Sequence, residues 1–122
     1  MDRVKRVRAS SAAKGPVRVR RGEIRRVARD IVARFAPRRI ILFGSHAEGR
    51  ARADSHVDLL VVTDARPGPD ASLKMRRATS CPFPVDIIVW NQKRLRQRIR
   101  AGDFFLRDAV ERGKVLYERP HR

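Results

Sequence analysis

Two aspartates, Asp58 and Asp86, occupy matching places in two apolar stretches of the sequence. Asp58 is the second residue of the run from Val57 to Val62, and Asp86 is the second residue of the run from Val85 to Trp90. Short apolar runs rich in β-branched residues are typical of buried strands. If the two strands are neighbours, their carboxylates can converge on one divalent cation, and Mg²⁺ prefers such oxygen ligands together with substrate phosphates.

Gly44 and Ser45 follow a third apolar run, Ile40 to Phe43, and are candidates for binding phosphate. Glycine lets the backbone approach a phosphate closely, and Ser45 adds a hydroxyl and an N–H at a turn that could open a helix, where anions are favoured. Metal ions held between carboxylates and phosphates stabilise the attacking and leaving oxygens of an in-line displacement. These residue types therefore indicate phosphoryl or nucleotidyl transfer.

The segment IILFGSHAEGRARADSHVDLLVV, from Ile40 to Val62, resembles the minimal nucleotidyltransferases of the polymerase-β superfamily. The motif of that family is Gly-Ser, ten residues and Asp-x-Asp, with a third carboxylate on a later strand, where Asp86 stands in PVDIIVW. The resemblance extends from about Glu23 to Tyr117. It implies an α/β fold of the α+β type, in which helices pack on a small mixed β-sheet, as in polymerase β.

His56 stands where the family has its first metal-binding aspartate. An imidazole supplies one neutral nitrogen in place of an anionic oxygen, so the site suits magnesium less well than manganese or zinc. Asp54, two residues earlier, either substitutes in part or is a turn residue. The resemblance implies catalytic and metal-binding roles for Asp58 and Asp86, with His56 as a substituted ligand or a base and with Mg²⁺ or Mn²⁺ as the cofactor.

Glu48 is a second departure, because many relatives carry a basic residue at this position. An anion here would repel a triphosphate, but Arg50 and Arg52 are near enough in sequence to compensate. The predicted nucleotide-binding and phosphate-binding residues are therefore Gly44, Ser45, Arg50 and Arg52.

The rest of the sequence supplies elements that can position these residues. Apolar residues recur at helical spacing after Glu23 and predict a helix that Pro37 ends. The later pattern predicts a weak helix over 71–79, one or two helices beyond Trp90 with Gly102 between them and Gly113 at their end, and a small edge strand over 115–117. The expected domain is thus residues 23–118, between a basic, disordered arm (1–22) and a short polar tail (119–122).

The net charge of the chain is +17, from 30 basic and 13 acidic residues, which favours polyanionic partners. A general preference for arginine explains the same charge equally well. The single cysteine, Cys81, and the lack of a long apolar run predict a cytoplasmic protein without a membrane partner.

Three functions follow as hypotheses. The first is a metal-dependent enzyme that transfers AMP from ATP to a protein or other acceptor; the resemblance implies a HEPN-type protein partner and the antitoxin role in a toxin–antitoxin pair. The second is an impaired nucleotidyltransferase fold that acts as a binding or regulatory partner, which His56 and Glu48 favour. The third is non-specific nucleic-acid binding through the basic surface, which would weaken steeply with salt.

Overall fold

The computed structural model describes residues 19–120. In chain order these residues form α1 (Arg21–Phe35), β1 (Arg39–Phe43), β2 (Val57–Thr63), α2 (Ala71–Ala78), β3 (Val85–Asn91), α3 (Gln92–Arg100), α4 (Phe104–Arg112) and β4 (Lys114–Glu118). The three predicted strands and the predicted edge strand are all present, and the segment beyond Trp90 forms two helices.

The strands form one four-stranded sheet in the order β3-β2-β1-β4. β1 is antiparallel to both β2 and β4, whereas β2 and β3 are parallel. Two parallel strands need a crossover connection, and α2 lies in the one that joins β2 to β3. The predicted mixed sheet with helices packed on it is therefore confirmed.

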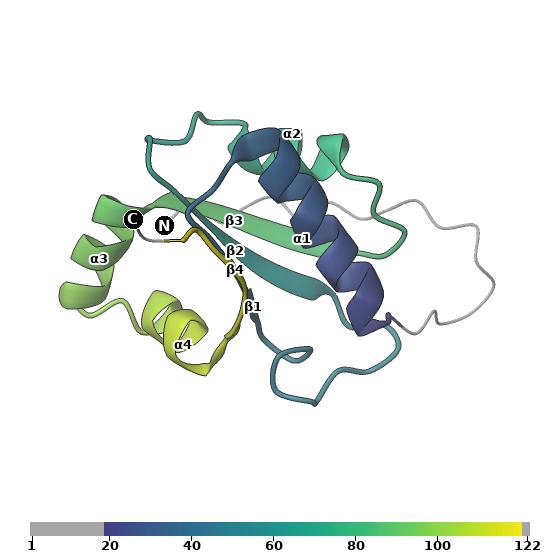
Figure 1. Cartoon of the computed structure of the whole chain (residues 1–122). Coiled ribbons are helices and arrows are strands. Elements are labelled where there is room, and N and C mark those ends of the chain that lie inside the picture. Colours follow the sequence, from purple (N-terminus) through teal and green to yellow (C-terminus); the bar gives the residue numbers. More distant parts are fainter. Residues whose placement is uncertain (1–18, 121–122) are drawn as a thin grey trace.

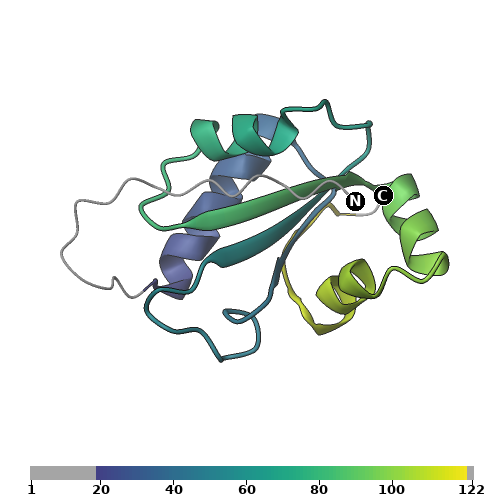
Figure 2. The same cartoon turned by 180° about the vertical axis from the view of Figure 1, so that it is seen from behind.

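Helices cover both faces of this sheet. α1 and α2 lie on one face, and α3 and α4 lie on the other (Figure 1), as Figure 2 shows from behind. Alternation along each strand divides the core in the same way, since neighbouring side chains point to opposite faces. Leu59 belongs to the cluster under α1 and α2, whereas Leu60 belongs to the cluster under α3 and α4.

Local capping explains where three of the helices begin. α1 starts at Arg21, two residues before the expected boundary, and the Glu23 side chain accepts a hydrogen bond from the Arg20 N–H at 3.0 Å. Asn91 caps α3 by accepting from Arg94 N, and Asp103 caps α4 by accepting from Leu106 N.

The predicted terminal segments are described only in part. Residues 1–18 of the predicted arm and residues 121–122 of the predicted tail lie outside the described residues. Arg119 is described, and its backbone N–H donates to Arg38 O at 2.7 Å, which places it against the start of β1. Within residues 19–120, no helix is long and apolar enough to cross a membrane.

Candidate active site

Asp58 and Asp86 lie side by side at one end of the sheet. Each is the second residue of its strand, and the parallel register pairs them directly. Adjacent strands are about 4.8 Å apart, and paired residues of a parallel ladder point to the same face. The two strands are thus neighbours, which is the condition for convergence of the carboxylates. The two carboxylates share one face of the sheet, the face covered further along by α3 and α4.

His56 precedes β2 and contacts the second of these aspartates. Its Nδ1 lies 3.5 Å from Oδ1 of Asp86, and the two side chains are only 9% and 14% exposed. The pair becomes an ion pair when the imidazole is protonated. The side chain for which the sequence predicted a role as metal ligand or base thus lies beside the aspartates. We call His56, Asp58 and Asp86 the carboxylate end of the sheet.

Gly44 lies next to Asp58 on the β1 side of this end. It directly follows Phe43, the last residue of β1, which the register pairs with Asp58. The backbone of Gly44 has φ 76°, a region that side-chain-bearing residues rarely adopt. A Cβ atom at this position would also overlap Oδ2 of Asp58. The turn therefore favours glycine, and a side chain at this position would also force the Asp58 carboxylate to shift.

The residues after Gly44 form a hydrogen-bonded turn, so the helix that the sequence suggested at Ser45 is absent. Gly44 O accepts from Ala47 N at 3.0 Å, and Ser45 O accepts from Arg50 N at 2.9 Å. His46 Nε2 lies 3.2 Å from Ser55 O and so connects the turn to the end of the same loop. Phosphate binding at Ser45 would rest on the turn and its hydroxyl, without a helix dipole.

Glu48 is bound by an arginine that the sequence analysis did not identify. Arg112, the last residue of α4, reaches Glu48 Oε1 at 2.6 Å, and Arg50 lies 3.4 Å from Oε2 of the same carboxylate. The charge expected to repel a triphosphate is therefore offset by two cations. No local pattern could have indicated Arg112, because it lies 64 positions from Glu48 in the chain.

The two predicted phosphate-binding arginines are both exposed and lie in the loop between β1 and β2. Arg50 is engaged by Glu48, whereas the backbone N–H of Arg52 donates to Ser55 Oγ at 2.8 Å. Ser55 follows Asp54, which is exposed and lies in a turn, as one of its two expected roles required. A phosphate role for Arg50 and Arg52 stays a prediction.

α4 carries two phenylalanines, Phe104 and Phe105, near the end of β1. The rings of Phe43 and Phe105 meet edge to face, with centroids 5.6 Å apart. Phe105 is 47% exposed and Phe104 is 79% exposed. An apolar surface therefore adjoins the end of β1, where Gly44 begins the turn.

The donor atoms at the carboxylate end determine which kind of metal site these residues fit. Among residues 19–120, no group of three or more His, Cys, Asp or Glu side chains is arranged to hold a metal ion. Magnesium is commonly held by one or two carboxylates together with substrate phosphates. Asp58 and Asp86 fit a cation that is shared with a bound triphosphate, and they do not fit a cage built by the protein alone.

Comparisons with known proteins bear on the family and the fold. Residues 24–116 match the family model of the nucleotidyltransferase domain. No curated protein matches the chain.

Solved structures with a similar fold include the following three, each less than 25% identical, so that they show the fold alone. A candidate nucleotidyltransferase from Sulfolobus solfataricus is 19% identical over 80% of this chain and 79% of its own, with a TM-score of 0.56. A toxin–antitoxin with AMP-PNP is 21% identical over 83% of this chain and 75% of its own, with a TM-score of 0.57. A mutant of the toxin–antitoxin MntA-HpeT is 19% identical over the same shares, with a TM-score of 0.54.

Proposed function

Because this chain belongs to the nucleotidyltransferase domain family, we propose that it transfers AMP from ATP to an acceptor in a metal-dependent reaction. The observation that carries the proposal is the register that sets Asp58 beside Asp86, next to the turn at Gly44. Carboxylates beside a glycine turn can receive the cation and the phosphates of one triphosphate. The structural neighbour with AMP-PNP, an ATP analogue, supports adenine as the base.

Each residue of the carboxylate end has a distinct task in this proposal. Asp58 and Asp86 would hold Mg²⁺ or Mn²⁺, which when bound stabilises the charge that develops on the transferring phosphate. Gly44 and Ser45 would receive the triphosphate through the turn, and Arg50 and Arg52 would add positive charge from the loop.

The bond changes follow from in-line displacement at phosphorus. An acceptor oxygen forms a bond to the α-phosphorus, the bond from that phosphorus to the bridging oxygen breaks, and pyrophosphate leaves. The proton of the acceptor hydroxyl passes to His56, which is oriented by its contact with Asp86 at 3.5 Å. The nearly complete burial of the His56 side chain keeps this proton transfer away from bulk water.

The acceptor in this proposal belongs to a protein partner of the HEPN type, with this chain as the antitoxin. Two structural neighbours are toxin–antitoxin pairs, which supports a protein partner. The exposed Phe104 and Phe105 beside the loop offer an apolar surface where such a partner can dock.

The test is a transfer assay with the purified full chain, ATP, Mg²⁺ or Mn²⁺, and a co-expressed HEPN partner. Intact-mass measurement should show addition of one AMP by the native protein and none by Asp58→Ala or Asp86→Ala. Asp70→Ala is the matched control, because Asp70 is exposed and its side chain makes no capping hydrogen bond. Loss of transfer in the control as well would contradict a specific role for the two aspartates.

A second candidate function is a non-catalytic regulatory partner that keeps the fold. Two observations favour it: His56 replaces an acidic ligand, and the part of the chain that the structure describes has no three-residue metal cluster. In this case the native protein transfers nothing, and His56→Asp gains activity. That result would exclude the enzyme, whereas native transfer that Asp58→Ala abolishes would exclude the silent partner.

A further inference from the structure

A cavity of about 460 Å³ lies at the end of the sheet opposite to the carboxylate end. Its lining residues come from the start of β1, the start of α3 and the end of β4, with the residues that flank them: Arg38, Arg39, Gln92, Arg96, Glu118, Arg119 and Pro120. We call it the arginine cavity. We propose that it binds a phosphate dianion, as a site separate from the one that would carry out transfer.

The sheet register separates the two sites. Asp58 is paired with Phe43 at the end of β1, whereas the arginine cavity begins at Arg39, four residues earlier on the same strand. At about 3.3 Å per residue this is about 13 Å. The buried side chains of Ile41 and Leu60 lie between the two ends on this face of the sheet. A ligand in the arginine cavity is therefore not part of the carboxylate end.

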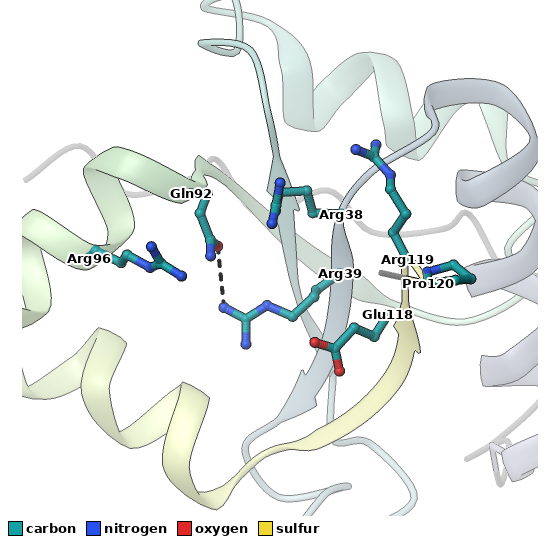
Figure 3. A pocket seen from close by; sticks show the side chains of 7 residues that line it. All are labelled: Arg38, Arg39, Gln92, Arg96, Glu118, Arg119 and Pro120. Carbon is teal, nitrogen blue, oxygen red and sulfur yellow. Dashed lines mark hydrogen bonds between the residues drawn. The ribbon is translucent and has the colours of Figure 1, made fainter. Parts of the chain in front are cut away.

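Two arginines of the cavity share a single neutral partner. Figure 3 shows Arg39 and Arg96 reaching toward each other from β1 and α3, with Gln92 beside the space between them. Gln92 Oε1 lies 3.5 Å from Arg39 Nη2, and with its amide turned it accepts instead from Arg96 Nη2 at 2.9 Å. Within residues 19–120, neither arginine forms an ion pair with a carboxylate. The amide oxygen can accept from only one of the two guanidinium groups at a time, and two positive charges this close repel each other unless an anion lies between them.

The other two arginines are held in place by Asp64. Arg38 Nη1 lies 2.9 Å from Asp64 Oδ1, and Arg119 binds the other carboxylate oxygen and also donates to Ala36 O at 2.7 Å. These contacts fix the wall of the cavity before any ligand arrives. Preformed arginine forks lose less conformational entropy on binding than free side chains.

The charge of the cavity matches that of a phosphomonoester. Four arginines and Glu118 line the cavity, and the neighbouring Asp64 pairs with two of the arginines, which leaves a net charge of two positive. A phosphomonoester carries about −1.5 to −2 at pH 7. Arginine forks match phosphate oxygens two at a time, and the cavity begins at the N-terminus of α3, where the helix dipole also favours an anion.

The lining also argues against recognition of a nucleobase. A volume of about 460 Å³ is typical of small-ligand sites, about 300 to 1,000 Å³. No aromatic ring is among its lining residues, so a base would have no platform on which to stack. The group recognised is therefore the phosphate itself, whether it is free, on a mononucleotide, or at the end of an oligonucleotide.

The experiment titrates the ¹⁵N-labelled full chain with inorganic phosphate at constant ionic strength, with EDTA present. We expect saturable shifts of the amide signals of Arg39, Gln92 and Arg96. Arg39→Gln and Arg96→Gln should each weaken binding about tenfold or more, the usual effect of losing a charge-assisted hydrogen bond. Arg100→Gln is the matched control, because it removes the same charge from an exposed position on the same helix.

Further measurements distinguish phosphate binding in the arginine cavity from the transfer reaction and identify the source of the phosphate. Asp58→Ala should bind phosphate as the native chain does. Phosphate binding can therefore be confirmed even if the transfer reaction proves absent. A 5′-phosphorylated tetranucleotide that binds more tightly than both its 5′-hydroxyl counterpart and inorganic phosphate identifies a nucleic-acid end as the source. Equal affinity for inorganic phosphate and the phosphorylated tetranucleotide identifies a free phosphate or mononucleotide.

Three results would overturn the proposal. The first is the absence of saturable shifts with phosphate, and the second is equal weakening by Arg96→Gln and Arg100→Gln, which would indicate the general positive field of the chain. The third is preference for a glutamate-rich peptide over phosphate, which would assign the cavity to carboxylates. Thermal unfolding of each variant shows whether a loss of binding is caused by a loss of folded protein. Arg96→Gln is the variant that should stay folded, because Arg96 is exposed.

Discussion

The two ends of one sheet face present opposite chemistry, although β1 runs from one end to the other. At one end, Asp58 and Asp86 lie beside a glycine turn; at the other, Arg39 faces Arg96 across Gln92. Between them lies a buried apolar cluster that contains Leu60 and packs against α3 and α4. A strand is thus apolar where helices cover it and charged where it emerges. Chemistry concentrates at strand ends because only there can charged groups reach a ligand and water.

The largest effect should come from the apolar cluster that separates the ends. Leu59 and Leu60 are both fully buried, but they lie on opposite faces of β2. Leu59→Ala and Leu60→Ala should each lower the free energy of unfolding by about 3 kcal/mol, measured by chemical denaturation. Only Leu60→Ala should also weaken phosphate binding and transfer per folded molecule, because its cluster supports both ends. Equal losses of phosphate binding and transfer in the two variants would contradict the idea that only the cluster around Leu60 supports both ends.

The glycine turn provides the second test. Gly44→Ala should destabilise the fold by about 2 kcal/mol and reduce transfer, because alanine is strained at positive φ and its Cβ overlaps Asp58. Gly49→Ala is the matched control, since Gly49 also has positive φ but has open space around it. It should cost about 1 kcal/mol and leave transfer per folded molecule unchanged. Thermal unfolding and the AMP-transfer assay measure both effects, and equal activity losses would mean that the overlap with Asp58 is irrelevant.

The third test changes the charge balance at the carboxylate end. Glu48→Gln releases Arg112 and Arg50, so the KM for ATP should fall, while stability should drop by about 1 kcal/mol or less, as for exposed ion pairs. Glu111→Gln is the control, because it removes the same charge from an exposed pair on α4. An increase of KM in Glu48→Gln would instead show that the Glu48–Arg112 contact is needed to shape the loop.

The smallest effect concerns the pH dependence at the arginine cavity. Hydrogen bonds from Arg119 and Arg38 lower the pKa of Asp64 below its ordinary 3.8. Because the pKa of Asp64 is lower in the folded state, its ion pairs with Arg119 and Arg38 stabilise the fold fully above about pH 4. This contribution is lost as the pH falls through the folded-state pKa of Asp64.

The measurement is the difference in stability between native protein and Asp64→Asn as the pH is lowered. Their stabilities should converge in acid, and an unchanged difference would contradict the assignment. The difference is needed because the pKa of Asp103 is also lowered, by hydrogen bonds from the Leu106 N–H and from Arg98.

Much of the fold follows from local pattern in the sequence. The apolar runs that contain Asp58 and Asp86 predicted two buried strands, and the helical spacing after Glu23 predicted α1. These predictions succeed because alternation and helical periodicity are set by neighbouring residues and by the need to bury apolar side chains. The turn after Gly44 was less predictable, since Gly-Ser after a strand is compatible with either a helix or a tight turn.

The sequence by itself determined which residues are candidates for chemistry: the Gly-Ser turn, the two aspartates and His56. Tertiary structure alone decided their relations, namely that Asp58 pairs with Asp86, that His56 contacts Asp86, and that Arg112 neutralises Glu48. It also assembled the arginine cavity, whose members come from strand and helix ends far apart in the chain. The physical reason is that register and long-range ion pairs depend on how elements pack, and local periodicity carries no information about which distant charges that packing brings together.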